Sequence, residues 1–280
     1  MTSLDPSLVE HAAELIAQAD ALVIAAGAGM GVDSGLPDFR GNTGFWKAYP
    51  ALEQARLDFT RVASPRTFET DPALAWGFYG HRLDLYRRTV PHAGFELLRR
   101  WSERVPLGSF VFTSNVDGQF QRAGFPEKDI DECHGSIHWL QCIHPCTDDM
   151  WPADALSPVV DANECRWIGE LPKCRHCGAL ARPNILMFGD GDWLERRTAV
   201  QQSRMDAWLG RARRPVVVEL GAGSYIVSVR HFSEQVIHGR AGRLVRINPR
   251  EPNVPTRWDV GLAAGALAGL MAIDSALDEL

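Results

Sequence analysis

Short apolar segments recur along this chain, and each is followed by a glycine or a polar turn. The clearest lie at residues 21–26, 109–115, 184–188, 215–220 and 242–247. Their length and composition predict buried strands, and the helical periodicity of residues 6–19 and of several intervening stretches predicts helices between them. Because strands that alternate with helices form parallel sheets covered on both faces, we expect an α/β fold with a doubly wound, Rossmann-like sheet.

Two stretches interrupt this alternation. Residues 42–89 are helical, rich in aromatics and bounded by prolines, whereas residues 138–182 contain five cysteines, several prolines and little periodicity. We expect these two insertions to form a smaller lobe beside a Rossmann-like domain, which the pattern divides into residues 1–41, 90–137 and 183–280. A chain of 280 residues is long enough for both.

The charge balance and the ends of the chain exclude several classes of partner. The 29 Lys and Arg against 35 Asp and Glu give a net charge of −6, which does not favour nucleic acid. The start, MTSLDPSLVE, lacks the basic and apolar regions of a signal peptide, and the longest apolar run, residues 260–273, is too short to span a bilayer. We therefore expect a soluble cytoplasmic protein with no membrane partner; no motif specifies an oligomeric state.

Four of the six cysteines form two closely spaced pairs, Cys142-x3-Cys146 and Cys174-x2-Cys177, with 27 residues between the pairs. Such pairs supply four thiolates to one tetrahedral Zn²⁺, which stabilises a segment too small for a core of its own. Disulfides are the first alternative, disfavoured by a reducing compartment, and a thioredoxin-like redox pair is the second, disfavoured because neither pair lies in a strand-to-helix turn. Four thiolates leave no open coordination position, so the zinc in this insertion should be structural.

A glycine-rich loop follows the first predicted strand. It contains Gly27-x-Gly29 but has Val32 where the dinucleotide fingerprint of dehydrogenases requires a third glycine. A second glycine-rich strand end, ELGAGS, occurs at residues 219–224, and an open sheet would present both loops on one edge. The loops predict a dinucleotide site that ordinary hydride transfer does not use.

Polar residues cluster at the other predicted strand ends. Asp38 and Arg40 follow the first loop, Asn115 and Asp117 follow the strand residues 109–112, and His134 precedes the first cysteine pair. Each has a structural alternative: a surface ion pair, a helix cap and a buried core imidazole, respectively. Several such clusters around one dinucleotide site favour function, because open α/β sheets bind ligands at their strand ends.

Together these motifs resemble the sirtuins, the NAD-dependent protein lysine deacylases. The resemblance covers residues 10–250 and rests on motifs in the order found in that family, namely GAGMGVDSGLPDFRG, TSNVDGQFQRAG, ECHGS, the two cysteine pairs, RPNILMFGD, LGAGS and RINPRE. It implies that NAD is consumed as a co-substrate, with release of nicotinamide and O-acyl-ADP-ribose, and that the partner is an acyl-lysine protein or peptide.

The resemblance also implies a role for each motif. His134 would be the general base, and Asn115 would order the ribose and the nicotinamide amide. The remaining NAD contacts would come from the glycine loops and their neighbours: Gly27, Ala28, Gly29, Asp38, Phe39, Arg40, Ser114, Asp117, Gly221, Gly223 and Asn248. The segment that contains Ile185, Leu186 and Phe188 would pair with the substrate peptide as a strand.

Three positions depart from the usual family pattern. Gly31 and Gly223 stand where serine is common, and Ser114 stands where the motif usually has Gln. Serine is shorter than glutamine and cannot deliver an amide to the same point. We therefore expect Ser114 to affect how the ribose is held.

A further match concerns the acyl group. Tyr79-x-x-Arg82 places a phenol and a guanidinium on one face of a predicted helix, similar to the pair with which one sirtuin branch holds succinyl and malonyl groups. The structural alternative is an ordinary Tyr and Arg on an amphipathic helix.

Three functions follow from these motifs. The leading one is an NAD-dependent protein lysine deacylase, active as a deacetylase or as a desuccinylase and demalonylase. The second is an ADP-ribosyltransferase or NAD glycohydrolase, which Ser114 keeps open. The third is a non-catalytic module that binds NAD or ADP-ribose, which the joint presence of Asn115, Asp117 and His134 disfavours, because binding alone needs no base.

Overall fold

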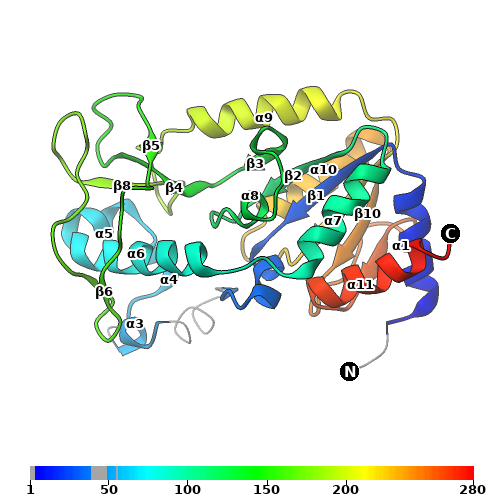
Figure 1. Ribbon diagram of the computed structural model, residues 1–280, viewed down its shortest axis with the longest axis horizontal. Coiled ribbons are helices and arrows are strands. Elements are labelled where there is room, and N and C mark those ends of the chain that lie inside the picture. The colour runs from blue at the N-terminus through cyan, green and yellow to red at the C-terminus, as the bar shows by residue number, and fades with distance from the viewer. Residues whose placement is uncertain (1–3, 39–48, 55) are drawn as a thin grey trace.

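The computed structural model of this protein describes residues 4–38, 49–54 and 56–280. A parallel six-stranded sheet with its helices forms the larger part, and a lobe of helices and antiparallel strands lies beside it (Figure 1). Within the described residues, no helix has the length and apolar character that crossing a membrane requires.

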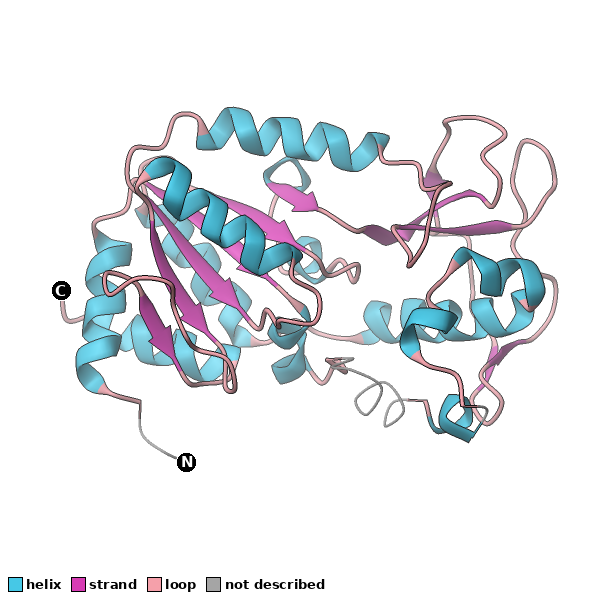
Figure 2. Cartoon of the chain, turned by 180° about the vertical axis from the view of Figure 1, so that it is seen from behind, coloured by secondary structure: helices cyan, strands magenta, loops and turns pink. Residues whose placement is uncertain are grey.

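The six strands of the large sheet run parallel in the order β11-β10-β9-β1-β2-β3 (Figure 2). Their bounds are Ala21–Ala26 (β1), Ser109–Thr113 (β2), Ile130–Glu132 (β3), Pro215–Leu220 (β9), Arg243–Ile247 (β10) and Val260–Leu262 (β11). The chain proceeds outward from β1 in one direction and then, from β9, in the other. Ala26 is paired with Thr113 and with Leu220, so three strands end at one level at this reversal point. The loops that follow them meet where doubly wound sheets bind ligands.

Alternate residues of β1 pack on opposite faces of the sheet. Leu22, Ile24 and Ala26 belong to a core with the apolar side chains of α1 (Pro6–Ala17), α7 (Ala93–Arg104) and α11 (Ala266–Leu277). Ala21, Val23 and Ala25 belong to another core with α9 (Arg196–Leu209) and α10 (Ser228–Arg240). The doubly wound α/β fold predicted from the sequence is thereby confirmed.

The first helix shows how local sequence signals place an element. Asp5 caps α1 by accepting a hydrogen bond from the backbone N–H of Ser7 at 3.0 Å, and Pro6 occupies the first turn, where it sacrifices no helical hydrogen bond. The helix ends at Ala17, two residues before the predicted end.

The smaller lobe combines both insertions around one core. Its helices are α3 (Pro50–Gln54), α4 (Phe59–Val62), α5 (Pro65–Thr70) and α6 (Pro72–Arg88), and its strands are β4 (Gly135–Cys142), β5 (Trp151–Pro152), β6 (Val160–Asp161), β7 (Arg166–Trp167) and β8 (Ala181–Ile185). Phe68, Trp76 and Phe78 of the helical part share buried contacts with Leu140 and Ala181 of the strands. Because β4 and β8 extend beyond the residue range 138–182, the exact domain limits stay a prediction.

The strand expected at residues 184–188 is placed differently from the prediction. It spans Ala181–Ile185 and runs antiparallel to β4 in the three-stranded sheet of the lobe, outside the large parallel sheet. A short apolar run cannot reveal which sheet it joins. Two of its polar residues, Arg182 and Asn184, are fully buried because Asp190 pairs with Arg182 at 2.6 and 2.9 Å and Gln141 accepts from Asn184 at 2.9 Å.

The remaining differences concern short elements. β2 ends at Thr113 rather than at residue 115, because Ser114 and Asn115 already form the turn. β3 and β11 have three residues each, too few for a recognisable period, and the apolar run at 260–273 divides into β11 and the start of α11. The short helices η1 (Ala28–Ser34), α8 (Gln119–Arg122) and η2 (Glu127–Asp129) complete the described structure.

Candidate active site

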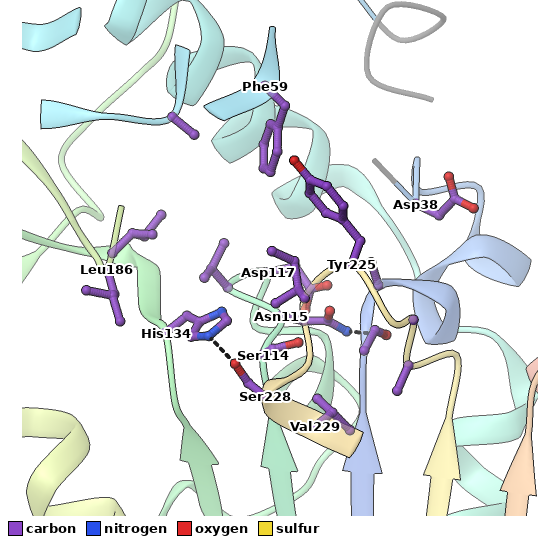
Figure 3. A pocket seen from close by; sticks show the side chains of 18 of the residues that line it. Asp38, Phe59, Ser114, Asn115, Asp117, His134, Leu186, Tyr225, Ser228 and Val229 are labelled. Atoms are coloured by element: carbon purple, nitrogen blue, oxygen red, sulfur yellow. Dashed lines mark hydrogen bonds between the residues drawn. The ribbon is translucent and has the colours of Figure 1, made fainter. Parts of the chain in front are cut away.

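A cavity of about 470 Å³ lies between the carboxyl edge of the parallel sheet and the smaller lobe. Its walls are mostly apolar, with polar side chains from the strand ends on one side (Figure 3). Fourteen of the residues predicted for the site line it, namely Gly27, Ala28, Asp38, Tyr79, Arg82, Ser114, Asn115, Asp117, His134, Ile185, Leu186, Phe188, Gly221 and Gly223. Segments far apart in the sequence thus meet at one place.

The two glycine loops touch each other at the base of the cavity. The N–H of Gly27 donates to Leu220 at 2.9 Å, and the N–H of Gly29 donates to Gly221 at 3.0 Å. Gly221 has φ +59°, and a Cβ on it would lie 2.4 Å from the Cα of Gly29. Only glycine permits this approach, so the loops can present backbone rather than side chains to a ligand.

Asn115 is held against the first glycine loop. Its backbone N–H donates to Thr113 Oγ1 at 3.0 Å, and its Nδ2 donates to the carbonyl oxygen of Gly27 at 3.0 Å. Thr113 Oγ1 in turn donates to the carbonyl oxygen of Ala26 at 2.9 Å. These bonds fix the orientation of the Asn115 amide. The side chain thereby forms a polar part of the cavity wall (Figure 3).

Asp117 follows two residues later and is buried. Its Oδ1 accepts the backbone N–H of Gln119 at 2.9 Å. Burial raises the pKa of Asp117 to about 6, although that hydrogen bond acts in the opposite direction. A carboxyl group with such a pKa in a ligand cavity is typical of functional sites.

His134 lies in the turn between β3 and β4, with its imidazole in the cavity. Nε2 lies 3.0 Å from Oγ of Ser228, the first residue of α10 (Figure 3). Burial lowers the pKa of His134, and the backbone carbonyl of Ser114 opposes that shift. The ring is therefore neutral at pH 7 and can accept a proton.

Tyr79 and Arg82 project from α6 into the same cavity, and both are buried. Arg82 Nε donates to the phenol oxygen of Tyr86 at 2.9 Å, and its guanidinium lies 5.1 Å from the ring centre of Phe78 and 5.3 Å from that of Tyr86. Burial raises the pKa of Tyr79 to about 12, so its phenol keeps its proton and can donate.

The segment after β8 bridges the two sides of the cavity. The N–H of Leu186 donates to the carbonyl oxygen of His134 at 3.0 Å, and the N–H of Phe188 donates to that of Ala63 at 3.0 Å. The Phe188 ring meets Phe59 edge to face at a centroid distance of 5.5 Å. A peptide strand beside this segment would therefore have to donate to the segment's carbonyl groups, because these two N–H groups are already used.

Among the described residues, two predicted contacts, Gly29 and Asn248, are not found in the cavity wall. Gly29 packs against Gly221 instead, and Phe39 and Arg40 lie outside the described residues. Asn248 is fully buried, donates from Nδ2 to Ala222 at 2.7 Å and accepts the N–H groups of Arg250 and Glu251 at 3.0 Å. Its side chain orders the second glycine loop from behind.

The four paired cysteines converge in the smaller lobe. Their sulfur atoms all lie within 4.8 Å of one another, with 3.7 Å between Cys142 and Cys177 and between Cys146 and Cys174. Tetrahedral zinc with Zn–S bonds of about 2.3 Å would separate its ligands by about 3.8 Å. The cluster therefore fits a closed, structural zinc site.

Sequence reasoning missed two cavity residues in particular, Ser228 and Tyr225. Both follow the glycine-rich strand end at 219–224, but neither belongs to a motif, and their side chains meet the site only through the fold. Phe59 also lines the cavity, but in the sequence nothing distinguishes it from the other aromatic residues of the helical insertion. The only available signal was their proximity to the glycine loop or, for Phe59, the general richness in aromatics.

Comparison with known proteins agrees with this geometry. A protein named NAD-dependent protein deacylase from Thermococcus kodakarensis is 28% identical over 255 residues, which are 90% of this chain and 89% of that protein. One from Pseudomonas aeruginosa, named NAD-dependent protein deacylase 1, is 36% identical over 178 residues, 63% of this chain and 65% of that protein.

Among solved structures, a mutant Sir2 homologue in complex with ADP-ribose superposes with a TM-score of 0.72 at 25% identity, covering 98% of this chain and 97% of that one. The profile of the Sir2 family matches residues 27–207, the span from the first glycine loop to α9. With the paired glycine loops, the cysteine cluster and the fold in agreement, we conclude that this chain belongs to the Sir2 family.

Proposed function

We propose that this protein is an NAD-dependent protein lysine deacylase in which His134 is the general base. The observation that supports it most strongly is a neutral, half-buried imidazole in the same cavity as Asn115 and the two glycine loops. Proton acceptance, amide recognition and close backbone approach are the three capacities that this reaction requires of the protein.

The NAD side of the cavity would be the edge formed by Gly27, Ala28 and Gly221–Gly223. The N–H groups of Gly27 and Gly29 donate within the protein, so other backbone N–H groups of this edge would contact the phosphates, and the absence of side chains at the glycines allows close contact. Asp38 and Asn115 lie beyond these loops and would contact the nicotinamide end of the dinucleotide. Asn248 would contribute indirectly, through the carbonyl of Ala222 that it holds.

The lobe side of the cavity would take the acyl-lysine. Phe59, Val116 and Phe188 supply apolar walls suited to the four-carbon stem of a lysine whose charge the acyl group has removed. The carbonyl groups of Ile185–Phe188 would accept hydrogen bonds from an extended peptide, a mode of recognition that depends little on sequence.

The proposed chemistry begins with loss of nicotinamide from the ribose, whose electron-poor C1′ the acyl oxygen can capture. His134 would then accept the proton of a ribose hydroxyl as that hydroxyl attacks the acyl carbon. The lowered pKa of His134 keeps the imidazole in the accepting form at neutral pH. The products would be deacylated lysine and O-acyl-ADP-ribose.

We further propose that the acyl pocket accepts a carboxylate-bearing group such as succinyl or malonyl. Arg82 carries a permanent positive charge in a largely apolar cavity, and the protonated phenol of Tyr79 lies on the same helix face. A distal carboxylate could accept from both, whereas acetyl has no group that could.

The cysteine cluster would have a structural role, because a tetrathiolate site leaves no position for substrate. None of the six cysteines is in a disulfide, which suits a reducing compartment and supports a cytoplasmic location.

Mass spectrometry of the products formed from NAD and a panel of acyl-lysine peptides tests the proposal. O-acyl-ADP-ribose together with deacylated peptide is the expected result. Free ADP-ribose with unchanged peptide would instead identify an NAD glycohydrolase, and a mass gain on protein would identify an ADP-ribosyltransferase, the alternative that the short Ser114 side chain in the cavity favours. Unchanged NAD in every reaction would identify a binding module.

A further inference from the structure

Two polar groups face the imidazole of His134, and they differ in what they can do. The backbone carbonyl of Ser114 can only accept a hydrogen bond. The hydroxyl of Ser228, 3.0 Å from Nε2, can donate or accept. When the ring proton is on Nδ1, Nε2 presents a lone pair to this hydroxyl. The lone pair of Nε2 then accepts the Ser228 hydroxyl.

The position of Ser228 is fixed by the fold. It is the first residue of α10, and the next residue, Val229, is 1% exposed within the core on that face of the sheet. The other end of the connecting loop is held at the carbonyl oxygen of Ala222, which accepts from Asn248 at 2.7 Å and from Arg230 at 3.1 and 3.2 Å. The loop that leads to Ser228 is thus held at both ends, and this places the Ser228 hydroxyl beside His134.

This geometry limits how His134 can act as a base. Nε2 is reached through Ser228, whose hydroxyl lies 3.0 Å away and whose side chain also lines the cavity. To use Nε2 as the base, a substrate hydroxyl must either displace Ser228 or pass its proton through it. Passage requires no movement of the helix end, which the buried Val229 holds in place.

We infer that Ser228 is a catalytic residue that relays a proton from the substrate hydroxyl to His134. The inference rests on the proposed deacylase function. In the step, the substrate oxygen forms its bond to the acyl carbon as its O–H bond breaks, and the proton passes to Ser228 Oγ. The original Ser228 proton passes at the same time to Nε2, so that serine ends neutral and His134 ends as imidazolium.

Kinetics of Ser228→Ala and Ser228→Thr provide the first test, with Ser224→Ala as a matched control. Ser224 lies in the same loop, but its hydroxyl donates to Glu251 at 3.0 Å and does not line the cavity. Ser228→Ala should lower kcat for deacylation by about 10- to 100-fold, less than loss of the base itself, because water can partly replace the hydroxyl. The KM for NAD should stay within a few-fold, and Ser228→Thr should restore most of the rate.

Exchange of labelled nicotinamide into NAD, measured with an acyl peptide present, separates a relay from a structural role. Exchange precedes the proton transfer, so Ser228→Ala should retain it within a few-fold while deacylation falls. Equal loss of exchange and deacylation would show that Ser228 maintains the site's shape and would overturn the relay. Unchanged or faster deacylation in Ser228→Ala would overturn it as well.

Nitrogen NMR of protein with labelled histidine tests the hydrogen bond between Ser228 and His134 in the absence of substrate. The relay requires that His134 carries its proton on Nδ1 at neutral pH and that its Nε2 resonance moves in Ser228→Ala but not in Ser224→Ala. A proton on Nε2 in the parent would refute the relay. A parent that shows the Nδ1 tautomer and the Ser228-dependent shift, yet leaves every acyl peptide intact, would instead refute the proposed deacylase function.

Discussion

Replacing Asp131 with asparagine should stabilise the fold, and the gain should increase from pH 5 to pH 8. Asp131 lies on β3, three residues before His134, and is 2% exposed. Within the described residues, its Oδ1 has no hydrogen-bond partner. Burial, reinforced by the nearby carboxylates of Asp206 and Glu132, raises the pKa of Asp131 to about 7, against which Arg197 acts only in part.

The sign and size of the effect follow from this pKa. A folded-state pKa above the unfolded value of 3.8 means that ionisation costs stability, and that this cost begins above the unfolded pKa and grows until the pH passes about 7. Integration gives a cost of about 2 kcal/mol at pH 5 and about 4 kcal/mol at pH 8. Asparagine is close in shape and cannot ionise. Its stabilising effect should therefore be about 2–3 kcal/mol larger at pH 8 than at pH 5.

Urea unfolding followed by circular dichroism at pH 5, 6, 7 and 8 measures the gain for Asp131→Asn. Asp148→Asn, which changes an exposed carboxylate, serves as the control and should alter the free energy of unfolding by less than about 0.5 kcal/mol throughout. Asp206→Asn should also stabilise, and the double variant should gain less than the sum, because the two carboxylates repel each other. An Asp131→Asn gain that is the same at pH 5 and pH 8 would refute the reasoning.

Four further predictions concern the site and the lobe. His134→Ala should lower acyl transfer by about 10²- to 10⁴-fold while calorimetry finds NAD affinity within a few-fold; full activity in a folded variant would contradict the role of base. Elemental analysis of the parent should find about one zinc per chain. The Cys174→Ser variant should lose this zinc, and limited proteolysis should show that its smaller lobe is unfolded; retention of zinc would exclude this cysteine as a ligand. Arg82→Met should reduce the preference in kcat/KM for succinyl- over acetyl-lysine by about 10- to 100-fold, whereas equal losses on both peptides would indicate a role in folding. Ser114→Gln should raise the ratio of deacylated peptide to free ADP-ribose, and an unchanged ratio would show that this position does not control ribose binding.

Local sequence signals determined much of the fold and of the candidate site. The strand at 21–26 was predicted with the bounds that the structure has, because a continuous apolar run followed by glycine leaves few alternatives. The two cysteine pairs indicated a metal site because their short spacing brings each pair of thiols together whatever the surrounding fold. His134 and Asn115 could be grouped because the ends of parallel strands share one edge of a sheet.

Tertiary structure alone decided the features that depend on contacts between distant segments. The apolar run near residue 184 joined the antiparallel sheet of the lobe, where Asp190 pairs with Arg182 and Gln141 accepts from Asn184. Ser228 and His134 are separated by 94 positions in the sequence, yet their side chains form a hydrogen bond because β3 and the start of α10 reach the same edge of the sheet. Spacing in sequence sets a distance only within a helix, a strand or a tight turn, and between such elements the distance is set by how their apolar faces pack.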